Sequence, residues 1–167
     1  MRNTLVTFLL AGLAVSATPL VLAQAQPATG SIELKNVAEV EADVKTADGK
    51  TVKQRVPVQK AVPGTEVFYT STFKNVSAKP AGNINITNPV PANTTLVAAS
   101  AYGEGMDISY SADGGKTWAA TDKVRVKTPD GKERPAALSE LTHIKWALRG
   151  DLPVGKQGEA GFRVVIN

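Results

Sequence analysis

Apolar and polar residues alternate along several short stretches of the chain, which is the pattern of strands with one buried face. Residues 144–148 and 162–167 are the clearest cases: Ile144, Trp146 and Leu148 alternate with neighbours of the opposite face, as do Phe162 and Val164. Shorter stretches of the same kind lie at 84–87, 108–110 and 124–126. In residues 67–73 the apolar side chains fall on both faces, because Phe68 interrupts the alternation. A strand that is apolar on both faces is typical of the centre of a sheet.

Two Asp-Gly-Lys sequences separate such stretches. Asp48-Gly49-Lys50 lies between residues 40–46 and 51–58, and Asp130-Gly131-Lys132 follows residues 124–128. Glycine accepts the positive φ that tight hairpin turns require, so both sequences predict hairpins. Residues 31–48, which contain no proline or glycine, also fit helical spacing. The turn that follows them favours a strand, because a hairpin needs extended flanks. One helical turn is expected within residues 136–141.

The number and spacing of the strands predict the fold class. About seven to nine strands, spaced by roughly ten residues, are typical of an antiparallel, immunoglobulin-like β-sandwich. We therefore expect an all-β sandwich over residues 31–167. The disulfide of antibody domains is missing, since the chain has no cysteine. Trp146 and Trp118 are expected to serve as core aromatics instead.

The first 25 residues have the pattern of an export signal. Arg2 gives a positive start, residues 5–17 are uncharged and mostly apolar, and Ala23-Gln24-Ala25 matches the small–x–small pattern of signal peptidase sites. Residues 5–25 are also long enough for a retained membrane anchor, although Thr18-Pro19 weakens that reading. We expect cleavage after Ala25 and a flexible leader at residues 26–30. This places the protein in the periplasm or at the surface, with membrane contact only through the signal peptide before cleavage.

Composition excludes several classes of function. Without cysteine, the chain is no thiol enzyme, iron–sulfur carrier or Cys-ligated zinc domain. Its single histidine rules out a His-rich metal site. The 19 Lys and Arg residues, against 15 Asp and Glu, are dispersed rather than gathered into a basic stripe with aromatics, so no nucleic-acid partner is expected. No cofactor, resident metal or catalytic group is expected either.

The sharpest local motif is Ser111-Ala112-Asp113-Gly114-Gly115-Lys116-Thr117-Trp118. It fits the Asp-box pattern Ser-x-Asp-x-Gly-x-Thr-Trp and resembles the boxes of sialidases and other β-propellers. A glycosidase would need repeated boxes, placed carboxylates and a much longer chain. We therefore predict a structural hairpin, in which the Asp carboxylate accepts backbone N–H bonds and the Trp ring folds onto the loop. The hairpin residues are Ser111, Asp113, Gly115, Thr117 and Trp118.

Other polar residues give weaker signals. His143 can act as a general base only if a nucleophile and an orienting acid converge on it, so a structural role is the simpler interpretation. Aspartates are scattered through turns without the spacing of a calcium loop, which leaves a loop calcium site open. Three Asn-x-Ser/Thr sequences match the glycosylation pattern and are interpreted as turn and strand residues; they begin at Asn75, Asn85 and Asn93.

A family resemblance follows from four successive segments and a C-terminal section. The segments are residues 62–70 (VPGTEVFYT), 73–77 (FKNVS), 86–91 (ITNPVP) and 95–100 (TLVAAS), and the final section contains His143, Trp146, Leu152, Pro153, Gly155, Phe162 and Val164. Together they resemble the bacterial surface-protein repeat family catalogued as domain of unknown function number eleven. The resemblance implies an immunoglobulin-like sandwich in an envelope protein and implies no chemistry. Asn88 stands where many members have Asp, and there is one copy rather than a tandem array.

These observations predict an exported, non-enzymatic envelope protein. It would act as a structural or protein-interaction module, with an envelope protein or surface polymer as its partner. The alternatives are binding of an extracellular glycan, with Tyr102 or Trp118 as a stacking platform, and a pilus-like or adhesive role. The latter would use the terminal strand at residues 162–167 for edge pairing. A hydrolase is disfavoured because no nucleophile, base and orienting group can be assembled.

Overall fold

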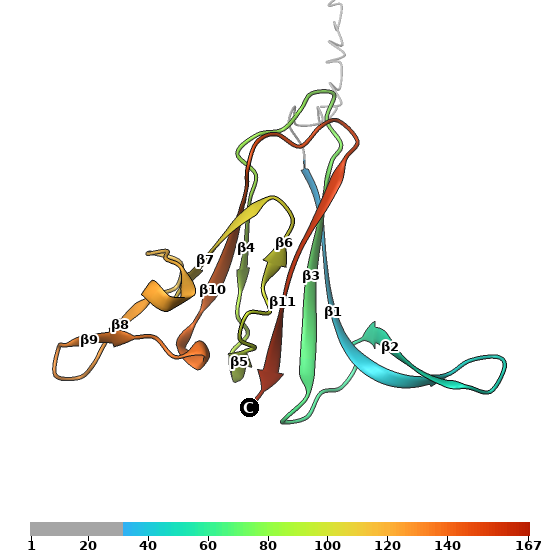
Figure 1. Ribbon diagram of the computed structural model, residues 1–167, viewed down its shortest axis with the longest axis horizontal. Helices are drawn as coiled ribbons and strands as arrows, with labels where there is room; N and C mark the ends of the chain where they lie inside the picture. The colour runs from blue at the N-terminus through green and yellow to red at the C-terminus, as the bar shows by residue number, and fades with distance from the viewer. Residues whose placement is uncertain (1–31) are drawn as a thin grey trace, which may run out of the picture.

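The computed structural model describes residues 32–167, which form eleven strands and two short 3₁₀ turns (Figure 1). The predicted signal peptide (1–25) and leader (26–30) lie outside the described residues. The all-β class is confirmed. There are more strands than predicted because β5 (Thr94–Leu96), β6 (Tyr102–Gly103) and β9 (Glu133–Pro135) are too short for alternation to mark them.

Two antiparallel sheets form an immunoglobulin-like sandwich, as predicted. The larger sheet has the order β2 (Thr51–Pro57), β1 (Ile32–Lys45), β3 (Glu66–Asn75), β11 (Gln157–Ile166) and β5, with β6 also beside β11. The smaller sheet has the order β4 (Asn85–Pro89), β10 (His143–Leu148) and β7 (Met106–Ser111). All pairings are antiparallel, so short connections suffice between neighbouring strands.

The core lies between the two sheets and is centred on Trp146. Its indole is fully buried, with a ring centroid 5.9 Å from that of Phe162 on the opposite sheet. Ile144 and Val164, one from each sheet, are equally buried. The alternation along β10 and β11 therefore marks the inward face of each strand, as predicted.

Strand β3 is central in the larger sheet, as its two apolar faces predict. It pairs with β1 on one side and β11 on the other. Val67 and Phe73 point inward and are buried in the core. Phe68 and Thr70, at positions of the opposite parity, lie on the outer face of the sheet. An aromatic residue on that outer face needs cover from elsewhere in the chain.

Residues 32–45 form a strand and not the alternative helix. Strand β1 is longer than the strand it adjoins: it pairs with β3 only as far as Glu39 and continues with β2 to Lys45. The β1–β2 hairpin therefore extends beyond the sandwich as an arm (Figure 1). The inner face of β1 is only partly covered, since the opposing sheet has three strands, and Leu34 is 49% exposed.

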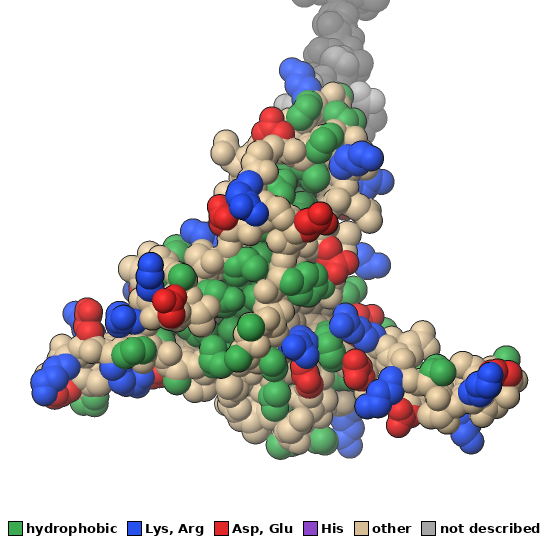
Figure 2. Space-filling view, viewed as in Figure 1, with side chains coloured by type: hydrophobic (Ala, Val, Ile, Leu, Met, Phe, Trp, Pro, Cys, Tyr) green, Lys and Arg blue, Asp and Glu red, His purple; other side chains and the backbone are tan. Residues whose placement is uncertain are grey.

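A second arm is formed by β8 (Arg125–Lys127) and β9. The two arms leave opposite sides of the body, at the end where the C-terminus lies (Figure 1). Charged side chains gather along both arms, with apolar side chains visible on the body between them (Figure 2).

The tips of the two arms have the same structure. In the first tip the Thr46 N–H donates to the Lys50 carbonyl at 2.8 Å, and in the second the Thr128 N–H donates to the Lys132 carbonyl at 2.8 Å. Each threonine hydroxyl also donates to the Asp two residues later. Gly49 and Gly131 have φ values of +81° and +82°, which confirms the two Asp-Gly hairpins.

In the described part of the chain, residues 32–167, helical structure is confined to η1 (Thr121–Lys123) and η2 (Leu138–Glu140). The second lies within residues 136–141, where one helical turn is predicted. Within residues 32–167 no helix has the length and apolar character needed to cross a membrane.

Candidate binding groove

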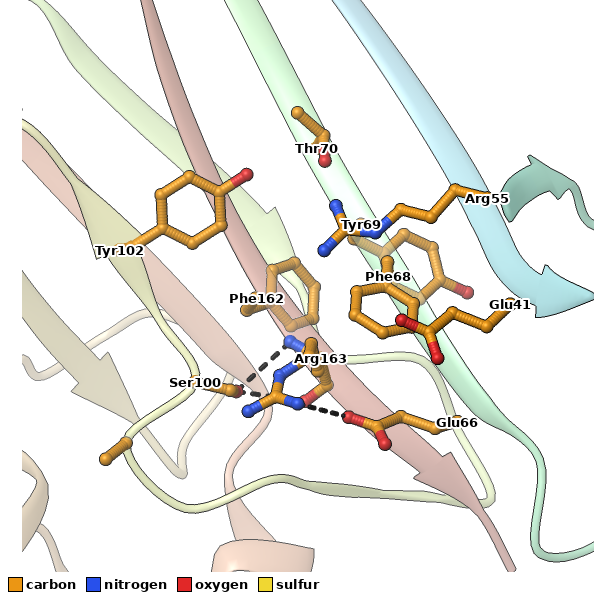
Figure 3. Close-up of a pocket in the computed structure, with 11 residues that line it drawn as sticks. Glu41, Arg55, Glu66, Phe68, Tyr69, Thr70, Ser100, Tyr102, Phe162 and Arg163 are labelled. Carbon is orange, nitrogen blue, oxygen red and sulfur yellow. Dashed lines mark hydrogen bonds and ion pairs between the residues drawn. The ribbon is translucent and has the colours of Figure 1, made fainter. Parts of the chain in front are cut away.

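A groove of about 420 Å³ lies on the outer face of the larger sheet. Its volume falls in the usual range for small-ligand sites. The β1–β2 arm curves over one side, and the segment from Ala99 to Tyr102 borders the other (Figure 3). The side chains used below come from four elements: Glu41 and Arg55 on the arm, Phe68 and Thr70 on β3, Arg163 on β11, and Tyr102 on β6.

Phe68 forms the base of the groove and is only 8% exposed. The guanidinium carbon of Arg55 lies 4.1 Å from the centre of its ring, and that of Arg163 lies 5.8 Å away. A guanidinium over an aromatic face gains from the ring quadrupole and from covering apolar surface. Phe68 is thus covered by two cations, and it holds the Arg55 guanidinium in place at the groove.

Arg163 is paired with a carboxylate and has a structural role. Its guanidinium forms an ion pair with Glu66, with Nη1 at 2.8 Å from Oε1. Its backbone N–H donates to the Ser100 hydroxyl at 3.1 Å, and that hydroxyl lies 3.2 Å from the Arg163 carbonyl (Figure 3). These contacts fix the loop that forms one wall of the groove.

Tyr102 lies flat against the sheet beside Gly161, its partner in the β6–β11 pairing. A Cβ atom on Gly161 would come within 2.6 Å of the Tyr102 ring, so only glycine allows this close approach. The Tyr102 hydroxyl donates to Glu159 Oε1 at 2.6 Å. Partial burial, followed by this bond to Glu159, raises the pKa of Tyr102 above its usual value. The phenol therefore stays neutral, with one face on the sheet and 42% of the residue exposed.

Arg55 differs from Arg163 because no carboxylate in the described part of the chain lies within ion-pair distance of it. Glu41 is its cross-strand neighbour in the β1–β2 pairing and also lines the groove. The guanidinium donors of Arg55 are held over Phe68 and remain open to a ligand. The groove thus combines an exposed aromatic face with an available cation.

The Asp-box residues form a hydrogen-bonded hairpin at the end of β7. Asp113 accepts the backbone N–H groups of Lys116 and Thr117, each at 3.0 Å, and the hydroxyls of Ser111 at 2.6 Å and Thr117 at 2.7 Å. The Ser111 hydroxyl oxygen also accepts the Gly115 N–H at 2.9 Å. The bonds from Ser111 and Thr117 hold the pKa of Asp113 far below its ordinary value. The carboxylate is saturated with donors, which is the arrangement of a structural turn.

The expectation that Trp118 is a core residue is wrong. Its side chain lies on the Asp-box loop, where the Lys145 ammonium is 4.6 Å from its ring centre and Gly115 packs beside it. The core position belongs to Trp146 alone of the two tryptophans. Both Gly115 and Lys145 contact the Trp118 ring. Tyr102 is contacted by the sheet on one face and is 42% exposed, so it is the better placed of the two predicted stacking platforms.

His143 lies on the other sheet from the groove, with its Nδ1 3.1 Å from the Thr142 hydroxyl. Within residues 32–167, no cluster of three or more His, Asp or Glu side chains is arranged to hold a metal ion. Asn75 is fully buried, so its amide is a structural group rather than an accessible glycosylation site.

Of the groove residues, only Tyr102 is predicted from the sequence as a binding residue. One signal was present: Phe68 breaks the alternation of β3 and places an aromatic residue on the outer face. The partners that cover it come from β2 and β11, and nothing in the local sequence of those strands indicates the contact.

No protein-family model matches the chain, and no curated protein shows significant sequence similarity to it.

Proposed function

We propose that this chain is an exported, non-enzymatic module of the bacterial cell envelope that holds another envelope component in the groove on its larger sheet. One observation carries the proposal: the groove presents an exposed Tyr102, held by its bond to Glu159, beside the available guanidinium of Arg55, which packs on Phe68. Such preorganised groups favour recognition, since little side-chain freedom is lost on binding.

The polar groups around the groove favour binding over catalysis. Arg163 is paired with Glu66, and partial burial, followed by the bond to Glu159, raises the pKa of the Tyr102 phenol and keeps it neutral. A nucleophile needs an adjacent base and a third group that orients this base. The Tyr102 hydroxyl has the Glu159 carboxylate at 2.6 Å, but within residues 32–167 no third side chain forms a hydrogen bond with Glu159. His143, the chain's one histidine, belongs to the opposite sheet.

Export and an envelope location rest on the N-terminal signal pattern and on the family resemblance of residues 62–167. An exported protein without cysteine must be stabilised by packing and hydrogen bonds alone, and the buried sandwich core and the hydrogen-bonded Asp-box hairpin are of that kind. Mass spectrometry of the protein recovered from the periplasm or medium tests this part. A mature N-terminus at Gln26 is expected, and recovery from the cytoplasm with an intact N-terminus contradicts export.

Binding of a glycan is a second candidate within the same proposal. The open face of Tyr102 favours it, because the exposed aromatic ring lies in a groove that is otherwise lined mainly by polar side chains.

In-cell photo-crosslinking tests whether the groove is the contact surface. A photoreactive aromatic amino acid is placed at Thr70, which lines the groove, and at the exposed Val154 in the β10–β11 loop as a matched control. We expect a reproducible envelope adduct from position 70 and none from position 154. Equal adducts from both positions, or none from either, contradict the proposal.

A further inference from the structure

We propose that the groove takes an acidic saccharide, with the sugar carboxylate on Arg55 and the face of a sugar ring on Tyr102. This inference rests on the proposed function, because it names the ligand of the same groove. It is built from four features: one open aromatic face, one available guanidinium, hydroxyl and carboxylate groups that also line the groove, and the polar character of the surrounding wall.

The Tyr102 ring offers one face only. Its other face lies on Gly161, where a Cβ atom would come within 2.6 Å of the ring. The ring direction is fixed further by the bond from its hydroxyl to Glu159. A flat, immobile aromatic face in partial contact with water suits a ligand with an apolar face and a polar rim. A pyranose ring has that shape, with C–H groups on its faces and hydroxyls around its edge.

Arg55 supplies the charge selectivity. A guanidinium binds carboxylates through two parallel N–H···O bonds, which an ammonium cannot reproduce. Packing at 4.1 Å over Phe68 orients this guanidinium before any ligand arrives. The edge of the Arg55 guanidinium faces the same groove as Tyr102 (Figure 3). Arg55 is also close enough that its charge lowers the pKa of the Tyr102 phenol slightly, against the larger, opposite effect of burial.

Further polar groups line the groove beside these two anchors. The Thr70 hydroxyl and the Glu41 carboxylate both line the groove (Figure 3). Hydroxyl-rich ligands can donate to Glu41 and exchange bonds with Thr70. The anchors of protein–protein interfaces are instead seated in well-packed pockets from which water is excluded. With Phe68 already covered by Arg55 and Arg163, the groove has no open apolar socket of that type.

Substitution of Glu41 should increase the affinity for an acidic saccharide. Glu41 is the cross-strand neighbour of Arg55, so its negative charge competes with a ligand carboxylate for the same cation. Glu41→Gln keeps a hydrogen-bonding oxygen and removes that competition. The affinity for an acidic saccharide should therefore rise in this variant, whereas the affinity for a neutral saccharide should not.

The test uses calorimetric titration of the mature protein with trigalacturonic acid and with its fully methyl-esterified form. The two probes share the same sugar rings and differ in the carboxylate charge. We expect the acid to bind about tenfold more tightly than the ester, the usual scale for a charge-assisted bidentate contact. Arg55→Gln should reduce acid binding to the level of the ester. Tyr102→Ala should weaken binding of both probes.

Lys53→Gln is the matched control, because it removes one cation from the same strand and the same face at a residue that does not line the groove. It should leave both affinities unchanged, and all variants should retain the circular dichroism spectrum of the parent. Equal binding of acid and ester, an unchanged affinity in Arg55→Gln, or no binding of either probe at millimolar concentration overturns the inference. If neither saccharide binds and position 70 crosslinks to a protein, the acidic-saccharide inference is overturned. The proposed function then still holds.

Discussion

Asn75 should be among the most sensitive polar residues of the fold. Its side chain is fully buried at the end of β3. The amide nitrogen donates to the carbonyls of Lys79 and Leu152, each at 2.8 Å. The amide oxygen accepts the Ser77 N–H at 2.9 Å and the Ser77 hydroxyl at 2.7 Å. One side chain thus joins the β3–β4 loop to the loop that precedes β11.

The cost of Asn75→Ala follows from these four hydrogen bonds. Each is worth about 1 kcal/mol net, and a buried group left without a partner costs more. Part of the loss is offset, because the Leu152 carbonyl keeps the Ala81 N–H and the Lys79 carbonyl keeps the Ser77 hydroxyl. We therefore expect a loss of about 3 kcal/mol in the free energy of unfolding, which lowers the melting temperature by roughly 10 °C in a domain of this size.

Asn75→Asp separates the hydrogen bonds from the volume of the side chain. It keeps the shape and the acceptor oxygen but loses both donors, and it places a buried carboxylate against two carbonyl oxygens. It should destabilise the protein more than Asn75→Ala does, since an unpaired buried charge is more costly than a small cavity.

Urea and thermal denaturation followed by circular dichroism measure both variants. Asn85→Ala is the matched control, because Asn85 is exposed and its side chain makes a single bond, to the Asn83 carbonyl; it should change stability by no more than about 0.5 kcal/mol. If Asn75→Ala lowers the free energy of unfolding no more than this control does, or if Asn75→Asp is as stable as the parent, the reasoning is refuted.

Three further predictions concern the core and the ionised turns. Asp113→Ala should lower the melting temperature more than the exposed control Asp107→Ala, because it removes the acceptor at the centre of the Asp-box hairpin; equal shifts contradict that role. The bond from Arg134, followed by that from the Ala137 N–H, lowers the pKa of Glu140 to about 2. The stabilising contribution of this carboxylate is therefore complete above about pH 4.5 and is lost as the pH falls toward 2. Glu140→Gln should reduce the loss of stability with falling pH in this range, and an unchanged pH dependence contradicts the pairing. Trp146→Phe should lower the free energy of unfolding by about 1 kcal/mol, and Trp146→Ala should lower it by about 4 kcal/mol. The difference is expected because the buried indole N–H has no partner within residues 32–167, so removing it offsets part of the lost packing. Urea titration measures both variants, and equal losses contradict this.

The local features of the fold were predictable from the sequence because their causes are local. Side-chain alternation follows from the two-residue period of a strand, so residues 144–148 and 162–167 showed which side chains of β10 and β11 point inward. The Asp-Gly turns at Gly49 and Gly131 were predictable for the same reason, since positive φ selects glycine at the residue itself. The Asp-box hairpin involves bonds that span four residues or fewer around Asp113.

The partners of each strand were decided only by the tertiary structure. Trp146 and Trp118 are the same residue type, yet one fills the core and the other lies on a loop beneath Lys145. The alternation around Trp146 shows which face of its strand the side chain takes, and it does not say which opposing surface that face will meet. Burial between two sheets is a property of the whole chain, and strands far apart in sequence compete for the same neighbours.

The groove shows this division most clearly. The sequence by itself determined that Phe68 departs from the alternation of its strand, that Tyr102 is a candidate aromatic platform and that residues 51–58 form the second half of a hairpin. Only the tertiary structure placed Arg55 over Phe68 and Tyr102 on Gly161. The first contact depends on how the β1–β2 arm curves, and the second on the pairing of residues 59 positions apart in the chain, Tyr102 and Gly161. Sheet pairing and twist set both, and neither is encoded in any short stretch of residues.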